Sequence, residues 1–124
     1  MNILLIDDDE WIRDAMRIFF ETESCKIIAL ETAEEALNMI SQQEYDIVIC
    51  DYKLPGLNGL TLLKEVRQTQ PNALTVLITA YKTDALVSEA KKTGVHGFIA
   101  KPFTSETIET ALSHLIAKQQ YGSQ

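Results

Sequence analysis

The sequence contains few of the residues that characterise secreted, fibrous or disordered proteins. Two cysteines among 124 residues, Cys25 and Cys50, are too few for a disulfide scaffold, and both lie among apolar neighbours. We therefore expect two buried free thiols in a reducing compartment. Three prolines and five glycines likewise exclude collagen-like and low-complexity chains.

Basic residues are also scarce. Eleven Lys and Arg stand against 18 Asp and Glu, which gives a formal net charge of -7. Surfaces that bind nucleic acids need clustered basic side chains to replace counterions, so we expect no direct nucleic-acid binding by this domain. The charge balance suits partners that bring cations or basic patches.

Long hydrophobic runs are missing as well. No stretch approaches the ~18 apolar residues that a membrane-spanning helix needs. The start of the sequence, Met-Asn-Ile-Leu-Leu-Ile-Asp, has no basic region before its short apolar run, which a signal peptide requires. These absences predict a cytoplasmic protein that does not associate with a membrane.

The length suits one domain with its own core, because a chain of this size buries about two-thirds of its surface on folding. We assign residues 1–118 to this domain. The polar end of the sequence, residues 119–124, is expected to form a flexible tail or the start of a linker.

Short apolar runs alternate with helical patterns along the sequence. Between and after the runs, apolar residues recur with the period of a helix. The runs are nearly continuous in apolar residues, as in strands that are buried on both faces of a parallel sheet. They cover residues 3–6, 27–30, 47–50, 74–78 and 97–100. This order predicts five βα units joined by right-handed crossovers, with helices on both faces of one sheet.

Polar residues and glycine mark the limits of the predicted helices. Thr32 and Glu35 form a capping box at the start of the second helix. Thr83 and Thr104 are candidate N-caps of the fourth and fifth helices, and Gly94 is expected to end the fourth.

The first helix is expected to pack on the sheet through one apolar stripe. Trp11 is expected to cover the start of this helix. The stripe consists of Ile12, Ala15, Met16 and Phe19.

Chemically distinctive side chains follow four of the predicted strands. Asp7 and Asp8 follow the first, Asp51 the third, Thr79 the fourth and Lys101 the fifth. In open parallel sheets, ligands bind beyond the carboxyl ends of the strands. We therefore expect acids, a hydroxyl and a cation to meet at one edge of the sheet.

This combination of side chains indicates phosphoryl chemistry. Three carboxylates at neighbouring strand ends repel one another unless a cation binds, and hard oxygen ligands of this kind suit Mg²⁺. Mg²⁺, Lys101 and Thr79 together would hold a phosphoryl group while an Asp carboxylate attacks it in line. Each residue alone also has a simpler interpretation, such as a solvated helix cap, a turn residue or a surface charge. It is their convergence that favours a site.

Four segments resemble the receiver domain of two-component response regulators over about residues 2–118. They are Leu-Leu-Ile-Asp7-Asp8-Asp9, Ile-Val-Ile-Cys-Asp51-Tyr-Lys-Leu-Pro55-Gly56-Leu-Asn-Gly59, Leu-Ile-Thr79-Ala80-Tyr81 and Gly97-Phe98-Ile-Ala-Lys101-Pro102-Phe103. The resemblance implies a single doubly wound, flavodoxin-like (βα)5 fold with the strand order 2-1-3-4-5.

The resemblance also implies a role for each residue of the acidic group. Asp51 is the phosphoacceptor. Asp7 and Asp8 bind Mg²⁺, with Asp8 as the more direct ligand and Asp7 acting largely through water. Lys53 supplies its backbone carbonyl to the metal, a role that does not depend on its side chain. Asp9 lies one residue beyond the acidic pair and is a helix cap.

By the same resemblance, Lys101 pairs with the phosphoryl group, and the Lys101-Pro102 bond is the family's cis peptide. Thr79 is the switch hydroxyl and Phe98 the switch aromatic, although without a hydroxyl Phe98 can signal only by ring packing. A plain core aromatic is the alternative for Phe98. The family's output surface is formed by the fourth helix, the fifth strand and the fifth helix.

The receiver interpretation implies a phosphoacceptor switch that assists its own phosphorylation and dephosphorylation, rather than an enzyme. The expected partners are a sensor histidine kinase or a histidine phosphotransfer protein, and a downstream effector or a second copy on the output surface. The chain is either a stand-alone receiver or the amino-terminal part of a larger, for instance transcriptional, regulator.

Two other functions remain as alternatives. A Mg²⁺-dependent phosphatase of the haloacid-dehalogenase type also uses an Asp nucleophile, but it needs Thr where this sequence has Trp11. A degenerate receiver-like binding module is disfavoured because the acids, the hydroxyl and the lysine are all present.

Overall fold

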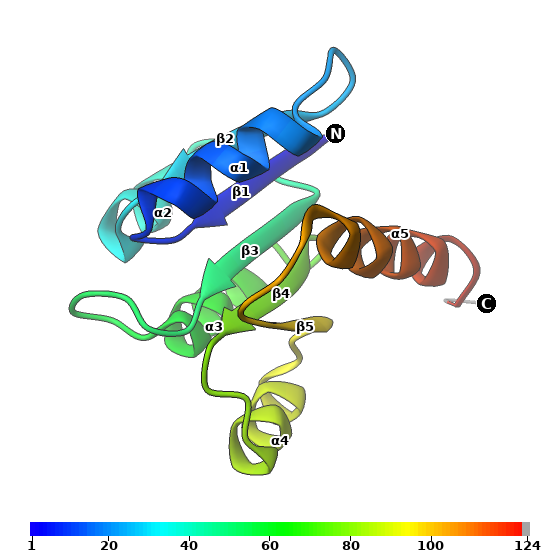
Figure 1. Ribbon diagram of the computed structural model, residues 1–124. Coiled ribbons are helices and arrows are strands. Elements are labelled where there is room, and N and C mark those ends of the chain that lie inside the picture. Colours follow the sequence, from blue (N-terminus) through cyan, green and yellow to red (C-terminus); the bar gives the residue numbers. More distant parts are fainter. Residues whose placement is uncertain (123–124) are drawn as a thin grey trace.

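The structure, a computed structural model, describes residues 1–122, along which five strands and five helices alternate (Figure 1). The strands are β1 (Asn2–Ile6), β2 (Lys26–Leu30), β3 (Ile47–Asp51), β4 (Leu74–Thr79) and β5 (Gly97–Ala100). The helices are α1 (Glu10–Phe20), α2 (Ala33–Ile40), α3 (Gly59–Thr69), α4 (Asp84–Thr93) and α5 (Ser105–Gly122). Each predicted strand is therefore confirmed to within one residue at either end.

The strands form one parallel sheet in the order β2-β1-β3-β4-β5. This order confirms the doubly wound, flavodoxin-like architecture. Helices α1 and α5 contribute to the core on one face of the sheet, and α2, α3 and α4 to the core on the other (Figure 1). The arrowheads of the strands in Figure 1 point toward the same edge of the sheet, where the loops that follow the strands gather.

The central strands are buried on both faces, as their continuous apolar sequences predict. Every residue of β3 and β4 is buried, and Leu4, Leu5 and Ile6 of β1 are fully inaccessible. The edge strands β2 and β5 are more open, because each has a neighbour on one side only. The alternation of apolar runs thus locates all five strands but does not distinguish the edge from the centre.

The predicted helix caps are confirmed. The hydroxyls of Thr32, Thr83 and Thr104 accept hydrogen bonds from backbone N–H groups three residues further along. Gly94 ends α4 with φ 92°, a left-handed conformation that favours glycine.

The last helix extends into the segment for which a tail or the start of a linker was expected. Helix α5 continues to Gly122, four residues past Lys118, where a flexible tail or linker was expected to begin. Residues 123–124 of that tail lie outside the described residues, and the division of the chain at residue 118 stays a prediction.

Two predictions for α1 are wrong. Trp11 has 86% of its surface exposed, so it does not cover the start of the helix, and Phe19 is 61% exposed. Phe20 packs against the core beside Met16 instead. Successive residues on a helix point about 100° apart, so a small rotation of the helix about its axis decides which of two adjacent aromatic side chains is buried.

The cysteines agree only in part with the expectation of two buried free thiols. Both thiols are unpaired, but Cys25 is half-buried while Cys50 is fully buried.

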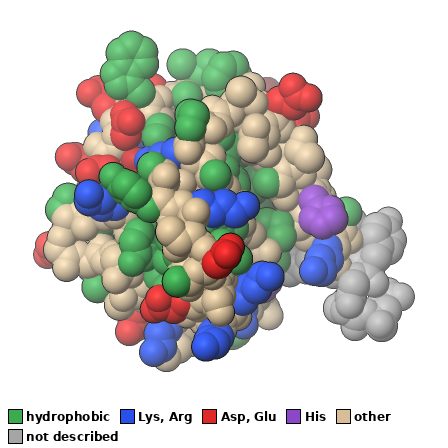
Figure 2. All heavy atoms as spheres, turned by 60° about the horizontal axis from the view of Figure 1, so that its bottom comes forward, with side chains coloured by type: hydrophobic (Ala, Val, Ile, Leu, Met, Phe, Trp, Pro, Cys, Tyr) green, Lys and Arg blue, Asp and Glu red, His purple; other side chains and the backbone are tan. Residues whose placement is uncertain are grey.

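The face shown in Figure 2 carries acidic, basic and hydrophobic side chains side by side. Among the described helices, none is long and apolar enough to cross a membrane.

Candidate functional site

The register of the parallel sheet brings the ends of four strands to one level. Ile6 pairs with Cys50, so Asp7 and Asp51 lie next to each other at the ends of the adjacent strands β1 and β3. Thr79 pairs with Ala100, so Lys101 follows directly beside it. The residues predicted from the strand ends are therefore brought together at the carboxyl edge of the sheet.

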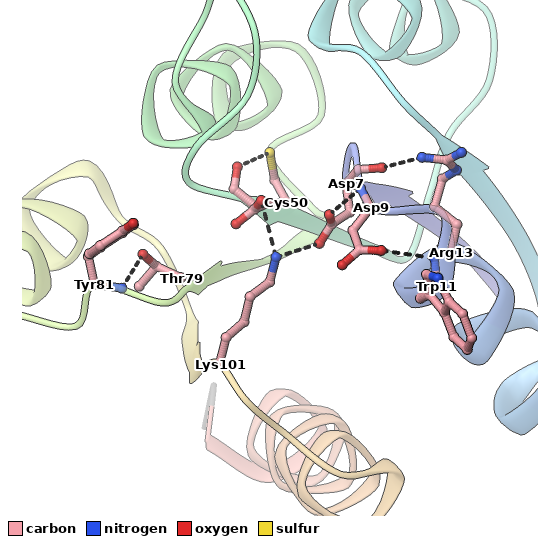
Figure 3. Close-up of polar contacts among 9 residues, drawn as sticks. Asp7, Asp9, Trp11, Arg13, Cys50, Thr79, Tyr81 and Lys101 are labelled. Atoms are coloured by element: carbon pink, nitrogen blue, oxygen red, sulfur yellow. Dashed lines mark hydrogen bonds and ion pairs between the residues drawn. The ribbon is translucent and has the colours of Figure 1, made fainter.

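The ammonium group of Lys101 bridges two carboxylates of the site. Its Nζ lies 3.1 Å from Oδ2 of Asp7 and 3.2 Å from Oδ2 of Asp51 (Figure 3). Asp7 is fully buried, Asp51 is 5% exposed, and the side chain of Lys101 is 20% exposed. The peptide bond between Lys101 and Pro102 is cis, as the resemblance implied.

Burial, with repulsion from a neighbouring carboxylate, raises the pKa of both buried carboxyl groups. For Asp7, burial is the main cause and the charge of Asp51 adds to it, whereas a hydrogen bond from the N–H of Asp9 and the charge of Lys101 oppose it. For Asp51, burial again raises the pKa, Lys101 opposes it, and Asp8 adds to it. Burial disfavours the Lys101 ammonium, but the two carboxylates outweigh this and raise its pKa.

Asp8 completes a group of three carboxylates. Asp7, Asp8 and Asp51 each offer an oxygen atom, and these atoms lie within 4.8 Å of one another. Asp8 is exposed to solvent, while the other two are buried. Among the described residues, Oδ2 of Asp7 has the ion pair with Lys101 but no hydrogen bond. This donor set fits Mg²⁺, which prefers carboxylate oxygens and keeps some of its water.

Thr79 lies at the same edge, on the other side of the cluster. It is 1% exposed, and its hydroxyl oxygen accepts a hydrogen bond of 3.0 Å from the N–H of Tyr81 (Figure 3). Its carbonyl accepts a hydrogen bond from the N–H of Lys101. The backbone at the end of β4 thus fixes the position of both residues.

Phe98 does not join the cluster. It is half-buried on β5, where it packs against the core that contains α3 and α4. The ammonium of Lys82, in the loop between β4 and α4, lies 5.9 Å from the centre of its ring.

The loop after β1 is held by side chains near the acidic pair. Oδ1 of Asp7 accepts from the N–H of Asp9, and Asp9 accepts from the N–H of Trp11 as the N-cap of α1. Arg13 donates to the carbonyl of Asp7 at 2.9 Å (Figure 3). The capping role predicted for Asp9 is confirmed, whereas Arg13 was not predicted because its partner is a backbone atom.

Gly59 is a further residue whose role the sequence did not reveal. A Cβ atom at this position would lie 2.0 Å from the carbonyl oxygen of Asp51 and 3.0 Å from Sγ of Cys50. Only glycine lets the first turn of α3 approach the end of β3 so closely. The glycine is visible in the sequence, but its neighbour in space is not.

A hollow of about 420 Å³ opens above Asp51. Its base includes Asp8, Asp51 and Lys101. One wall consists of residues 53–55 after β3, and the other of residues 79–81 at the end of β4. Ligands that reach Asp51 through this hollow therefore pass between two loops.

Comparison with known proteins identifies the family of this chain. A family model described as "Response regulator receiver domain" matches residues 3–113. The chain is 29% identical to the sporulation initiation phosphotransferase F of Bacillus subtilis, and the match covers 90% of each chain. It spans only 32%, 24% and 16% of three other curated relatives, which are longer proteins.

Solved structures share the fold. A CheY-like response regulator receiver domain protein from Methanospirillum hungatei JF-1 is 25% identical, with a TM-score of 0.86 and 96% of each chain covered. A response regulator from Burkholderia pseudomallei, described with a phosphorylated aspartic acid and a calcium ion, is 27% identical with a TM-score of 0.82. That match covers 95% of this chain and 72% of the other.

Proposed function

This chain belongs to the response regulator receiver domain family of two-component systems, and from that premise we propose that Asp51 is its phosphoacceptor. The observation that carries the proposal is the convergence of Asp51 with Asp7 and Lys101 at ion-pair distance. The phosphorylated aspartic acid of the Burkholderia pseudomallei relative supports it. The haloacid-dehalogenase alternative gains no support from the family match.

In the proposed reaction, a carboxylate oxygen of Asp51 attacks the phosphorus atom of the donor in line, and the bond from phosphorus to the donor breaks. Lys101 lies where its ammonium can offset charge on the phosphoryl oxygens. Mg²⁺, when bound, supplies a second positive charge for these oxygens. Asp8, Asp51 and the backbone carbonyl of Lys53 would hold it directly, and Asp7 largely through water.

The same residues would make the protein a switch rather than an enzyme with a separate substrate, although it assists its own phosphorylation and dephosphorylation. Thr79 would bond a phosphoryl oxygen, and Phe98 would change its packing on β5. The surface formed by α4, β5 and α5 would then bind an effector or a second copy of the chain.

We further propose a histidine kinase or a histidine phosphotransfer protein as the donor. A second hollow, of about 520 Å³, adjoins the site at Lys101 and lies between α1 and the segment after β5. Trp11, Ile12 and Phe103 contribute to its lining. An apolar surface beside Lys101 suits a protein donor that must bring its phosphorylated side chain to Asp51.

The assignment is tested by incubating the protein with Mg²⁺ and acetyl phosphate and measuring its intact mass. One phosphoryl group should be added to the wild type and none to Asp51→Asn. The adduct should be lost at alkaline pH or with hydroxylamine, as expected of an acyl phosphate. An unmodified wild type, or an Asp51→Asn variant modified to the same extent, would refute the assignment.

A further inference from the structure

Asp8 carries an exposed carboxylate that no neighbouring side chain holds in place. By contrast, the carboxylate of Asp7 is fixed by Lys101 and by the N–H of Asp9. In the part of the chain that the structure describes, the carboxylate of Asp8 has no hydrogen bond or ion pair, although it is one of the three groups that fit Mg²⁺. The direction of this carboxylate is therefore set by the backbone on either side of it.

Two hydrogen bonds fix that backbone. The peptide unit after Asp8 is held through the N–H of Asp9, which donates to Oδ1 of Asp7 at 2.9 Å. The peptide unit before Asp8 is held through the carbonyl of Asp7, which accepts from the guanidinium of Arg13 at 2.9 Å (Figure 3). Because peptide units are planar, fixing the unit on each side leaves the Cα atom of Asp8 little freedom to turn.

We propose that Arg13 is a positioning residue for the metal site and aims the Asp8 carboxylate at Mg²⁺ through the carbonyl of Asp7. The proposal rests on the proposed function, in which Asp8 holds the metal directly. Groups that lie behind the ligands of a metal set its affinity, because they fix where the ligands point. Arg13 does this from α1, through a contact with the backbone at the end of β1.

The charge of Arg13 and its hydrogen bond have opposite effects on Mg²⁺ binding. A guanidinium near a divalent cation repels it, so on charge alone the loss of Arg13 should strengthen the binding of Mg²⁺. Loss of the hydrogen bond releases the peptide unit before Asp8 and should weaken the binding. Removal of a group that orients a metal ligand costs about 10–100-fold in affinity. We expect the lower end, about tenfold, because the hydrogen bond from Asp9 to Asp7 remains.

The experiment measures the dissociation constant of Mg²⁺ by isothermal titration calorimetry, without a phosphoryl donor. Arg13→Met should bind Mg²⁺ about tenfold more weakly than the wild type. Arg13→Lys keeps the charge but has a shorter side chain without the planar fork, so its affinity should lie between the two. Weaker binding in this variant cannot come from a lost charge.

Arg17→Met is the matched control. Arg17 lies one turn further along α1 and also donates to a backbone carbonyl, that of Ala29 at 3.3 Å. The variant removes the same charge and the same kind of hydrogen bond, but its partner does not adjoin the acidic pair. Its dissociation constant for Mg²⁺ should stay within about twofold of the wild type, because exposed charges are screened by salt.

The Mg²⁺ dependence of phosphorylation by acetyl phosphate provides the second measurement. Arg13→Met should need about tenfold more Mg²⁺ for the half-maximal rate and should approach the wild-type rate at saturation, because Asp51 and Lys101 are unchanged. If neither Arg13 variant bound Mg²⁺ more weakly than the wild type, or if Arg13→Met stayed slow at every Mg²⁺ concentration, the positioning role would be overturned and Asp51 would remain the phosphoacceptor. A wild type that binds no Mg²⁺ and gains no adduct would instead overturn the proposed function, and the positioning role with it.

Discussion

Replacement of Gly59 by alanine should disrupt the connection between the phosphoacceptor strand and α3. The added Cβ would lie 2.0 Å from the carbonyl oxygen of Asp51 and 2.8 Å from its carbonyl carbon. Close contacts between carbon and oxygen in proteins are about 3.3 Å or longer. The start of α3 must therefore move away from the end of β3 by about 1.3 Å, the difference between these distances.

This movement is not easily absorbed, because both sides of the contact are fixed. The N–H of Gly59 donates to the carbonyl of Tyr52 at 2.7 Å, and the Sγ–H of Cys50 donates to the carbonyl of Asp51 at 3.3 Å. Overpacking of a buried position costs about 1–3 kcal/mol. Since the atom in the way is backbone rather than a flexible side chain, we expect a loss of about 3 kcal/mol in the free energy of unfolding, the upper end of that range.

The assay is urea unfolding followed by far-UV circular dichroism, because Trp11 is already 86% exposed and its fluorescence is a weak reporter of unfolding. Gly56→Ala is the matched control. Its Cβ would meet no atom within 4 Å, and its φ of 83° alone should cost about 1–2 kcal/mol. Phosphorylation by acetyl phosphate should slow in Gly59→Ala but not in Gly56→Ala. If Gly59→Ala were no less stable than Gly56→Ala, the close approach of α3 to Asp51 would be refuted.

Two further predictions concern polar groups away from the site. The Tyr45 hydroxyl is buried without a hydrogen bond among the described residues, so Tyr45→Phe should leave the urea midpoint unchanged or raise the free energy of unfolding by up to about 1 kcal/mol; a clear loss would show that the hydroxyl is bonded. His96 accepts a hydrogen bond at Nδ1 from the N–H of Thr75. Burial, followed by the charges of Arg67 and Lys118, lowers its pKa. The unfolded chain therefore binds the proton more readily, and the free energy of unfolding should fall as the pH drops through about 6.5, by at most about 1.4 kcal/mol per pH unit. Urea unfolding between pH 5 and pH 8 should show a smaller pH dependence in His96→Gln, and equal dependence in both proteins would contradict this.

The positions of the site residues could be predicted because they depend on topology alone. In a parallel sheet, the residue after each strand lies at the same edge whatever its side chain does. Asp7, Asp51, Thr79 and Lys101 are therefore found together, as the apolar runs indicated. Their individual roles stay predictions until the adduct is measured.

Features that depend on the contact of one side chain with another segment could not be predicted. The ammonium of Lys53 lies 5.4 Å from the centre of the Tyr81 ring, and this contact requires two loop conformations to agree. The exposure of Trp11 and Phe19 depends on the rotation of α1 about its axis, which the helical period leaves open over a broad apolar face. The last turn of α5 has no apolar pattern that distinguishes it from a polar tail.

Thr79 couples the site around Asp51 to the loop that leads to α4. Its hydroxyl oxygen accepts the N–H of Tyr81, so the position of that oxygen and the start of the loop that leads to α4 are coupled. If Asp51 is phosphorylated, three anionic oxygens replace one carboxylate charge beside Thr79, and the hydroxyl must turn toward them to donate. That rotation would move the acceptor of the Tyr81 N–H, and with it Tyr81, which lines the hollow. The next residue, Lys82, contacts the ring of Phe98 on β5. A single rotation at Thr79 would therefore act on both residues of this loop, Tyr81 beside the hollow above Asp51 and Lys82 beside Phe98.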